Sequence, residues 1–393
     1  MASVRKREWT NRDGSQSVKW LVDYKDQFGK RRFKNFNRKR DADEWITQAA
    51  WEVAKGIHTA DSQTISVAEA CDMWIKAAEA NDRERGTIQQ YRQLADLHIK
   101  PLIGAEKLSR LTRPKAEAFR DKLLKTRSKA MTGKVVRALS SVLREAMRHG
   151  VLSQNVAADV RVTRSSRERS KVVIPTLAEL RSLLGKADDD FRPLLMTAIM
   201  TGLRSSELRG LPWADVNLKL GTITVSQRAD KFSQLGPPKS AAGYRTIPIG
   251  NSLVALLEDW ELRCPKGDHD LVFPNSVGRV QDYAHLLRRR FFPLQIAAGV
   301  CVPDMVGGKP RLDDDGQVVL KARYGLHALR HAAASAWIKQ RVDIKRLQVW
   351  IGHENIELTI DTYGHLIEDS DGDAALVIAV QEALLASSEE ADV

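Results

Sequence analysis

The stretch from residue 327 to residue 365 decides how the chain is interpreted, because it gathers imidazoles, a guanidinium and a phenol. Its phrases are His327-Ala-Leu-Arg330-His331, Ile351-Gly352-His353 and Thr362-Tyr363-Gly364-His365. His327 and Arg330 are three residues apart, so on a helix they share one face. A guanidinium beside neutral imidazoles suits a phosphate whose charge changes, and the phenol of Tyr363 could act as a nucleophile. Taken alone, these residues also fit a helix surface and an ordinary core tyrosine.

A second charged group lies more than a hundred residues upstream, in Thr201-Gly202-Leu203-Arg204-Ser205-Ser206-Glu207-Leu208. An apolar helix is predicted for residues 194–200. The glycine ends that helix and the arginine opens the next one. Arg204 and Glu207 are again three residues apart, so the carboxylate is expected to support the guanidinium.

A lysine lies between these two groups. Residues 222–227 and 245–249 have the character of strands. Lys239-Ser240 follows a Gly-Pro-Pro turn and precedes Tyr244-Arg245-Thr246-Ile247-Pro248-Ile249. Lys239 is therefore predicted to sit on or beside a hairpin tip. Lys231 lies outside the Lys-Ser phrase, so it is the weaker candidate for a functional lysine in this region.

In this order, the residues Arg, Glu, Lys, His, Arg, His and Tyr resemble the signature of the tyrosine recombinase (phage integrase) family. The matching phrases are Thr-Gly-Leu-Arg-Xaa-Xaa-Glu-Leu, Lys-Ser before Arg-Thr-Ile-Pro, His-Xaa-Leu-Arg-His, Ile-Gly-His and Thr-Tyr-Gly-His-Leu. Each phrase is weak alone, but five in this order are specific. The resemblance covers residues 170–370 by motif and the whole chain more loosely.

The resemblance implies a site-specific recombinase that integrates or excises a phage or another mobile element. Tyr363 would attack the scissile phosphate and leave a 3′-phosphotyrosyl link and a free 5′-hydroxyl. This covalent link keeps the bond energy of the phosphodiester, so no cofactor is expected.

The resemblance also implies the remaining catalytic roles. Arg204 and Arg330 would be bidentate donors to the transition state. Lys239 would protonate the leaving 5′-oxygen, His327 would accept the tyrosine proton, and His353 would hydrogen-bond the phosphate.

Two further histidines are expected to be structural. His327 and His331 have the spacing of a zinc half-site, but the glutamate of HExxH is missing and no third ligand is evident, so no metal site is predicted. His365 stands just after Tyr363. Ten residues separate His353 from Tyr363, where some relatives have nine, which leaves the phase of the tyrosine helix open.

The composition indicates a soluble protein with a polyanionic partner. The 393 residues are 43% hydrophobic, which suits two or three domains, and they carry a formal net charge of +12 with a pI near 9.6. Three scattered cysteines indicate a reducing compartment. The chain has no apolar signal core and no run of about eighteen apolar residues. We therefore expect a cytoplasmic, nucleoid-associated bacterial protein without membrane contact.

Residues 1–60 are predicted to form a three-stranded sheet with one helix. Residues 18–24 and 30–36 alternate like strands, and a helix is expected from residue 41 to residue 55. Strands that interleave basic and aromatic residues can enter a DNA groove, and the resemblance implies an arm-type DNA-binding domain. A structural cap with a solvated basic face is the alternative. The expected DNA contacts are Arg5, Lys6, Arg7, Lys30, Arg31, Arg32, Arg38, Lys39 and Arg40.

Residues 64–160 are predicted to form a four-helix domain, which the resemblance implies to be the core-binding domain. Ser66 and Glu69 make a capping box at the start of its first helix. Further helices are expected at residues 87–99, 114–125 and 129–149. The basic run 161–171 lacks apolar residues for about eight positions, so a hinge that needs a partner for order is expected there.

Residues 172–393 are predicted to form an α+β catalytic domain, opened by a capping box of Thr176 and Glu179. Most of it is expected to be helical, with a short sheet around residues 221–249. For residues 302–323 we expect a surface hairpin or loop and have no functional interpretation. The predicted fold class is therefore multidomain, mainly α with small β.

An apolar helix predicted for residues 374–385 needs a groove to cover it. It could pack on its own domain. The resemblance implies instead that four copies exchange these helices on DNA. The expected partners are double-stranded attachment sites, together with an accessory DNA-bending protein or an excisionase.

Three other functions were weighed against the integrase. A relaxing type IB topoisomerase would use the same chemistry, but the basic N-terminal module and the apolar C-terminal helix favour assembly on several sites. A resolvase-type recombinase has the same motifs, and the arm-binding module favours the integrase. A catalytically silent DNA-binding regulator would lack the tyrosine or an arginine, and neither is missing.

Overall fold

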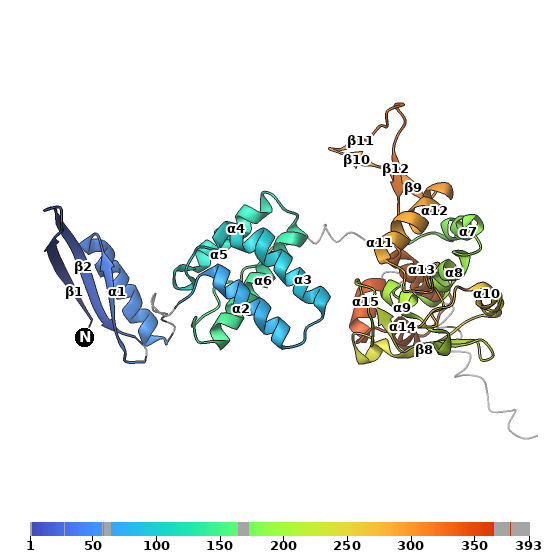
Figure 1. Ribbon diagram of the computed structural model, residues 1–393, viewed down its shortest axis with the longest axis horizontal. Helices are drawn as coiled ribbons and strands as arrows, with labels where there is room; N and C mark the ends of the chain where they lie inside the picture. The colour runs from blue at the N-terminus through green and yellow to red at the C-terminus, as the bar shows by residue number, and fades with distance from the viewer. Residues whose placement is uncertain are drawn as a thin grey trace, which may run out of the picture. The chain divides into compact units, whose positions relative to one another are not determined.

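The computed structural model describes residues 2–26, 28–56, 58, 64–163, 173–364 and 378. It divides into two compact units, residues 1–169 and 170–393, and each is described by itself (Figure 1). Three expectations lie outside the described residues: most of the basic run 161–171, His365, and the helix at 374–385 apart from Ile378. Within the described ranges, the model has no helix with the length and apolar character that a membrane crossing requires.

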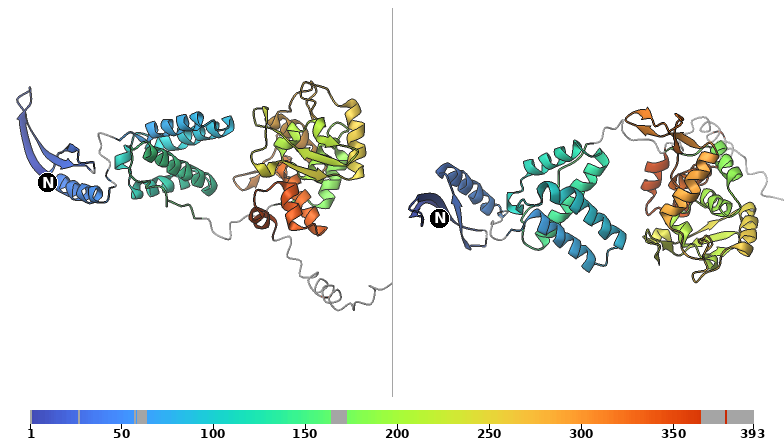
Figure 2. Two further views of the ribbon diagram at one scale, coloured as in Figure 1. Left: turned by 90° about the horizontal axis from the view of Figure 1, so that it is seen from below. Right: turned by 45° about the horizontal axis from the view of Figure 1, so that its top comes forward.

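The first unit begins with the predicted three-stranded sheet and helix (Figure 2). The antiparallel strands, in spatial order, are β1 (Ser3–Thr10), β2 (Gln16–Lys25) and β3 (Arg31–Phe36). Helix α1 (Lys39–Ala54) packs on one face, where Val22 and Tyr24 are buried with Ala42. These strands and this helix have a small core of their own.

Helices form the rest of the first unit, as predicted. They are α2 (Val67–Ala80), α3 (Arg85–Leu94), α4 (Lys100–Ile103), α5 (Arg113–Leu124) and α6 (Lys129–Arg148), with a 3-10 turn at Leu108–Arg110. The predicted capping box of Ser66 and Glu69 is present. A π-helical turn (Ala95–Ile99) joins α3 to α4. Pro101 follows this turn in the first turn of α4, where its missing N–H is tolerated.

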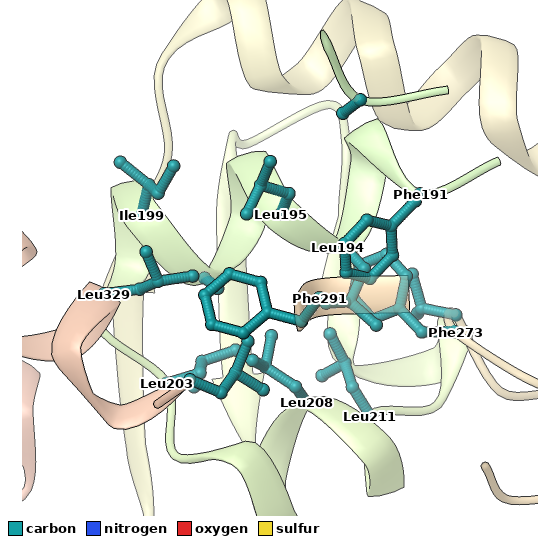
Figure 3. Packing of buried hydrophobic residues seen from close by; sticks show 14 of the residues in the cluster. Phe191, Leu194, Leu195, Ile199, Leu203, Leu208, Leu211, Phe273, Phe291 and Leu329 are labelled. Atoms are coloured by element: carbon teal, nitrogen blue, oxygen red, sulfur yellow. The ribbon is translucent and has the colours of Figure 1, made fainter. Parts of the chain in front are cut away.

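The second unit is mainly helical. Its helices are α7 (Leu177–Lys186), α8 (Arg192–Thr201), α9 (Ser205–Gly210), α10 (Asn251–Arg263), α11 (Tyr283–His285), α12 (Phe292–Ala297), α13 (His327–Lys339), α14 (Ile344–Ile351) and α15 (Ile356–Tyr363). A π-helical turn (Leu286–Phe291) joins α11 to α12. One large core surrounds Phe291 and includes Leu195 of α8 and Leu329 of α13 (Figure 3). The predicted capping box of Thr176 and Glu179 opens α7.

A short antiparallel sheet of three strands packs within this unit. Its order is β4 (Val216–Asn217), β5 (Thr222–Val225) and β8 (Arg245–Pro248). Between β5 and β8 the chain forms a separate hairpin of β6 (Arg228–Ala229) and β7 (Leu235–Gly236), and 3-10 turns lie at Trp213–Asp215 and Ala241–Gly243. Lys231 lies at the tip of this hairpin, whereas Lys239 follows β7. The predicted hairpin is the pair of β5 and β8, and Lys239 lies on the connection between these two strands, beside the inserted hairpin of β6 and β7.

Residues 301–322 project from the second unit as paired short strands (Figure 1). β9 (Cys301–Pro303) pairs with β12 (Leu320–Ala322), and β10 (Met305–Val306) pairs with β11 (Lys309–Pro310). This arrangement confirms the predicted surface hairpin.

Candidate active site

Arg204 is positioned by the end of α8 and the start of α9. Gly202 ends α8 with a φ of +60°, and a Cβ there would lie 3.3 Å from the Cβ of Ala333 on α13. Arg204 occupies the N-cap position of α9, and its backbone N–H donates to Oε2 of Glu207 at 2.9 Å. Its guanidinium donates to Oε1 of Glu207 and to the carbonyl of Gly352, both at 2.7 Å. The expected contact between Arg204 and Glu207 is present.

Glu207 is buried and shared between two arginines. Arg245, which the sequence placed on a strand without a role, donates to the carboxylate through Nη1 at 3.1 Å and Nη2 at 2.7 Å. Burial raises the pKa of Glu207, but the hydrogen bond and charge of Arg245, with the charge of Arg204, hold it below its ordinary value. The carboxylate is therefore ionised and offsets one of the two cations.

Arg330 lies on α13, one turn beyond His327, and its side chain is buried. Nη1 donates to the carbonyl of Gly202 at 2.8 Å, and Nη2 donates to the carbonyl of Ile351 at 2.5 Å. Burial and the charge of Arg204 lower the pKa of Arg330 to about 9. That value is still above neutral pH, so the guanidinium remains a cation.

Three arginines meet at the C-terminal end of α14. The carbonyls of residues 350, 351 and 352 accept hydrogen bonds from Arg245, Arg330 and Arg204 in turn. Carbonyls at the end of a helix lack intrahelical partners and carry the negative end of its dipole, so cations stabilise them. We call Arg204, Arg245, Arg330 and these carbonyls the arginine clamp. It fixes the backbone directly before His353.

Tyr363 ends α15 and is only 1% exposed, in a small core between α13, α14 and α15. Its hydroxyl is hydrogen-bonded to Nδ1 of His331, at 2.8 Å. Burial raises the pKa of Tyr363, and the charge of Arg330 opposes this. Burial, with the charges of His327 and Arg330, lowers the pKa of His331 to about 4, so its imidazole is neutral at neutral pH.

His327 and His353 flank this pair. The ring of His327 lies 4.8 Å from that of His331 between centroids, and the ring of His353 is parallel to that of Tyr363 at 6.4 Å. Nδ1 of His353 is hydrogen-bonded to the Thr359 hydroxyl at 2.9 Å. Burial, followed by the charges of Arg330 and Arg204, lowers the pKa of His353 to about 4. The structure thus brings His327, His331 and His353 together with Tyr363.

The two candidate lysines both lie on the segment between β5 and β8 and are exposed. Arg209 holds the hairpin tip that carries Lys231, because it donates to the carbonyl of Asp230 at 3.1 Å and to the hydroxyl of Ser233 at 3.2 Å. Lys239 lies on the segment that returns to β8. Both lysines stay candidates for the acid.

The N-terminal sheet divides its predicted DNA contacts between two faces. Strand alternation puts Arg5, Arg7 and Arg31 on the face away from α1. Arg32 points to the other face, where its Nε donates to Asp26 at 2.9 Å and its side chain is 12% exposed. Arg32 is therefore a structural ion pair, which corrects its prediction as a DNA contact. The other predicted contacts are exposed: Lys6, Lys30, Arg38, Lys39 and Arg40.

Sequence reasoning missed Arg245 and the contact of His331. A signal for Arg245 existed, because it shares strand parity with the buried Ile247, and an arginine at an inward position requires a buried partner. No comparable signal existed for His331, because its contact with Tyr363 depends on how α15 packs on α13.

Fold and site together define a tyrosine recombinase. A helical domain with a short sheet brings two arginines of the predicted set, Arg204 and Arg330, to one helix end, and the helix that follows carries the tyrosine. Residues 174–369 match the model of the phage integrase family. The chain belongs to this family.

Relatives and solved structures agree with this assignment. The chain is 22% identical over 321 residues to the ICEBs1 integrase of Bacillus subtilis, which covers 80% of this chain and 83% of the relative. It is 24% identical over 316 residues to an integrase of Streptomyces ambofaciens, covering 76% of each chain.

Two solved structures share the fold. The Tn1549 transposon integrase in complex with transposon right-end DNA has a TM-score of 0.64 at 19% identity, over 81% of this chain and 100% of that one. The lambda integrase tetramer bound to a Holliday junction has a TM-score of 0.57 at 18% identity, over 88% of this chain and 95% of that one.

Proposed function

We propose that this recombinase integrates and excises a mobile element by cutting DNA strands with Tyr363. The observation that carries the proposal is the convergence of three elements on the C-terminal end of α14. Arg204 from the start of α9 and Arg330 from α13 bind its carbonyls. Tyr363 from α15 packs on the same helix, in a core that includes Leu347 and Ile351.

In the proposed step, the phenolic oxygen of Tyr363 bonds to phosphorus and the bond to the 5′-oxygen breaks. The phenol gives its proton to an imidazole and the 5′-oxygen takes one from a lysine, so protons balance. A guanidinium has five N–H groups, and the hydrogen bonds of Arg204 and Arg330 described above use only part of them. The remaining donors suit the non-bridging oxygens, where charge gathers in the transition state.

The other roles follow the same proposal. His327 is the exposed imidazole of the group, and it would accept the phenol proton. Lys239 would protonate the leaving oxygen, with Lys231 as the alternative. His353 would hydrogen-bond the phosphate. Glu207 would support Arg204, and His331 would hold the hydroxyl of Tyr363 before reaction.

We propose three functional domains: an arm-type DNA-binding domain at 1–60, a core-binding domain at 64–160 and a catalytic domain at 172–393. For the first, the face with Arg5, Arg7 and Arg31 is the proposed DNA surface. All three arginines are exposed, although Arg31 and Arg5 also pair with Asp23 at 2.5 and 3.7 Å. The same face carries Phe33, which is 58% exposed. Basic side chains beside an exposed aromatic ring suit contact with a DNA groove.

The proposed partners are two attachment sites in duplex DNA and three further copies of this chain. A similar fold assembles as a lambda integrase tetramer on a Holliday junction. The exchanged C-terminal helix would be residues 374–385, and an accessory DNA-bending protein or an excisionase would join the complex. A recombinase acting on chromosomal sites would work at the nucleoid.

A nicked suicide substrate carrying the attachment core tests the proposal. The full-length protein should form a covalent DNA adduct on denaturing gels, and Tyr363→Phe should bind the same DNA without forming it. An adduct on Tyr363→Phe contradicts the choice of nucleophile. Plasmid relaxation without any junction intermediate would point to a topoisomerase instead.

A further inference from the structure

Arg245 has no assigned role in the reaction, yet it is a buried member of the arginine clamp. Its side chain is 1% exposed, against 35% for Arg204. Nε donates to the carbonyl of Trp350 at 2.7 Å, Nη1 donates to the carbonyl of Gly243 at 3.0 Å, and both Nη atoms reach Glu207. This is a fork-to-fork ion pair whose geometry a lysine cannot reproduce.

The carboxylate of Glu207 determines how much positive charge Arg204 presents. If Glu207 paired with Arg204 alone, the two charges would cancel, and a phosphate would meet a neutral pair. With Arg245 on the same carboxylate, two cations share one anion, and one positive charge remains. Because Arg245 is enclosed and Arg204 is partly exposed, that charge is available on the side of Arg204.

We propose that Arg245 is a positioning residue for strand cleavage. It takes up the charge of Glu207 so that Arg204 can hold the scissile phosphate, and it ties this pair to the backbone before His353. The inference rests on the proposed function, because it presumes that Arg204 binds the phosphate.

The test uses the full-length protein and compares the cleavage rate after removing the charge of Arg245 alone with the rate after removing the charges of both Arg245 and Glu207. Arg245→Met leaves Glu207 to neutralise Arg204, so single-turnover cleavage of the suicide substrate should fall at least about tenfold, while half-site binding changes less than about twofold. Adding Glu207→Gln removes the excess negative charge, so the double variant should cleave at least about threefold faster than Arg245→Met. Arg263→Met removes an ion-paired arginine of α10 that does not touch Glu207, and it should cleave like the wild type.

Two results overturn the inference. One is a folded Arg245→Met protein that cleaves within about twofold of the wild type. The other is a folded double variant that cleaves no faster than Arg245→Met, since anchoring of the backbone alone would then explain the loss. Arg245→Met could instead fail to unfold cooperatively on heating, because a buried carboxylate has lost its partner. In that case the double variant tests the inference. The inference holds only if the double variant forms adduct within about tenfold of the wild-type rate.

The same gels separate this inference from the proposed function. Wild-type protein without an adduct, or Tyr363→Phe with one, contradicts the proposed function. Wild-type protein with a Tyr363-dependent adduct, beside an unaffected Arg245→Met, contradicts only the role of Arg245.

Discussion

The hydrogen bond between His331 and Tyr363 shows how burial changes the pKa of a histidine and so its possible role in proton transfer. With a pKa near 4, His331 is a poor proton acceptor for a phenol whose own pKa is raised. Transfer of the proton to this ring is therefore strongly uphill. The ring holds the hydroxyl in place, and the proton must leave by another group. Burial and the charge of Arg330 also lower the pKa of His327, but its side chain is exposed, and it remains the proposed acceptor.

The same burial predicts how stability depends on pH. His331 has a pKa of about 4 when folded and an ordinary value of 6.5, so below pH 6.5 the unfolded chain binds a proton that the folded chain does not. This contribution to the free energy of unfolding is complete above pH 6.5 and is lost as pH falls toward 4. Thermal unfolding between these values should show a smaller pH dependence in His331→Asn than in the wild type.

The exposed His269 provides the control for this experiment. His269→Asn should leave the pH dependence of thermal unfolding as it is in the wild type. Equal slopes for His331→Asn and the wild type would show that the imidazole of His331 is protonated alike in both states.

At the scale of single residues, the sequence could predict contacts between residues close together in the chain but not contacts between distant ones. Arg204 and Glu207 are three residues apart, so local geometry predicted their contact. Arg245 is 38 residues from Glu207, and only the folded sheet brings them together. His331 is 32 residues from Tyr363, and that contact depends on the packing of α15.

At the scale of elements, the end of α14 depends on one glycine. Gly352 has a φ of +71°, and a Cβ there would lie 2.9 Å from the carbonyl oxygen of Ala242 and 3.0 Å from Nη1 of Arg245. Gly352→Ala should cost more than the 1–2 kcal/mol, roughly, of a left-handed alanine, because it also pushes on the arginine clamp. Urea unfolding and suicide-substrate cleavage should both show a loss.

Gly299 is the matched position, since its φ is also +71° and a Cβ there meets no atom within 4 Å. Gly299→Ala should carry only the conformational cost and leave cleavage unchanged. Equal losses of stability and cleavage in both variants would mean that contact with the clamp adds nothing.

Element boundaries were predictable where the signal is local. Both capping boxes were visible as a hydroxyl residue followed three positions later by glutamate, and both form. The π-helical turns at residues 95–99 and 286–291 were not predicted, because one extra residue in a helical turn leaves the apolar spacing almost unchanged. The hairpin of β6 and β7 was also missed, since its strands are two residues long.

At the scale of the whole molecule, the sheet and helix at the N-terminus have their own core and carry none of the proposed catalytic groups. Deleting residues 1–60 should therefore leave binding and cleavage of a core site within about threefold of the full-length protein. Recombination between sites that need distant arm sequences should fail. Mobility shifts, adduct gels and plasmid recombination measure the three activities.

A milder variant separates loss of contacts from loss of the domain. Arg5→Ala with Arg7→Ala removes two cations from the open face of the sheet and leaves the core of Val22 and Tyr24 intact. It should weaken arm-site binding in the same direction as the deletion. Undiminished recombination by the truncated protein would dismiss arm binding.

The burial of Tyr363 bears on how such an enzyme can share a cell with a whole chromosome. A positively charged protein spends most of its time on unrelated sequences, which outnumber its own sites by roughly a millionfold. A side chain that is 1% exposed cannot reach a phosphorus atom in a duplex. If Tyr363 is the nucleophile, as proposed, α15 must release it before a strand can break, and the cutting rate then scales with the released fraction. Bound protein that has not released the tyrosine would do no damage, so genome integrity would be protected at the step of cutting rather than at the step of binding.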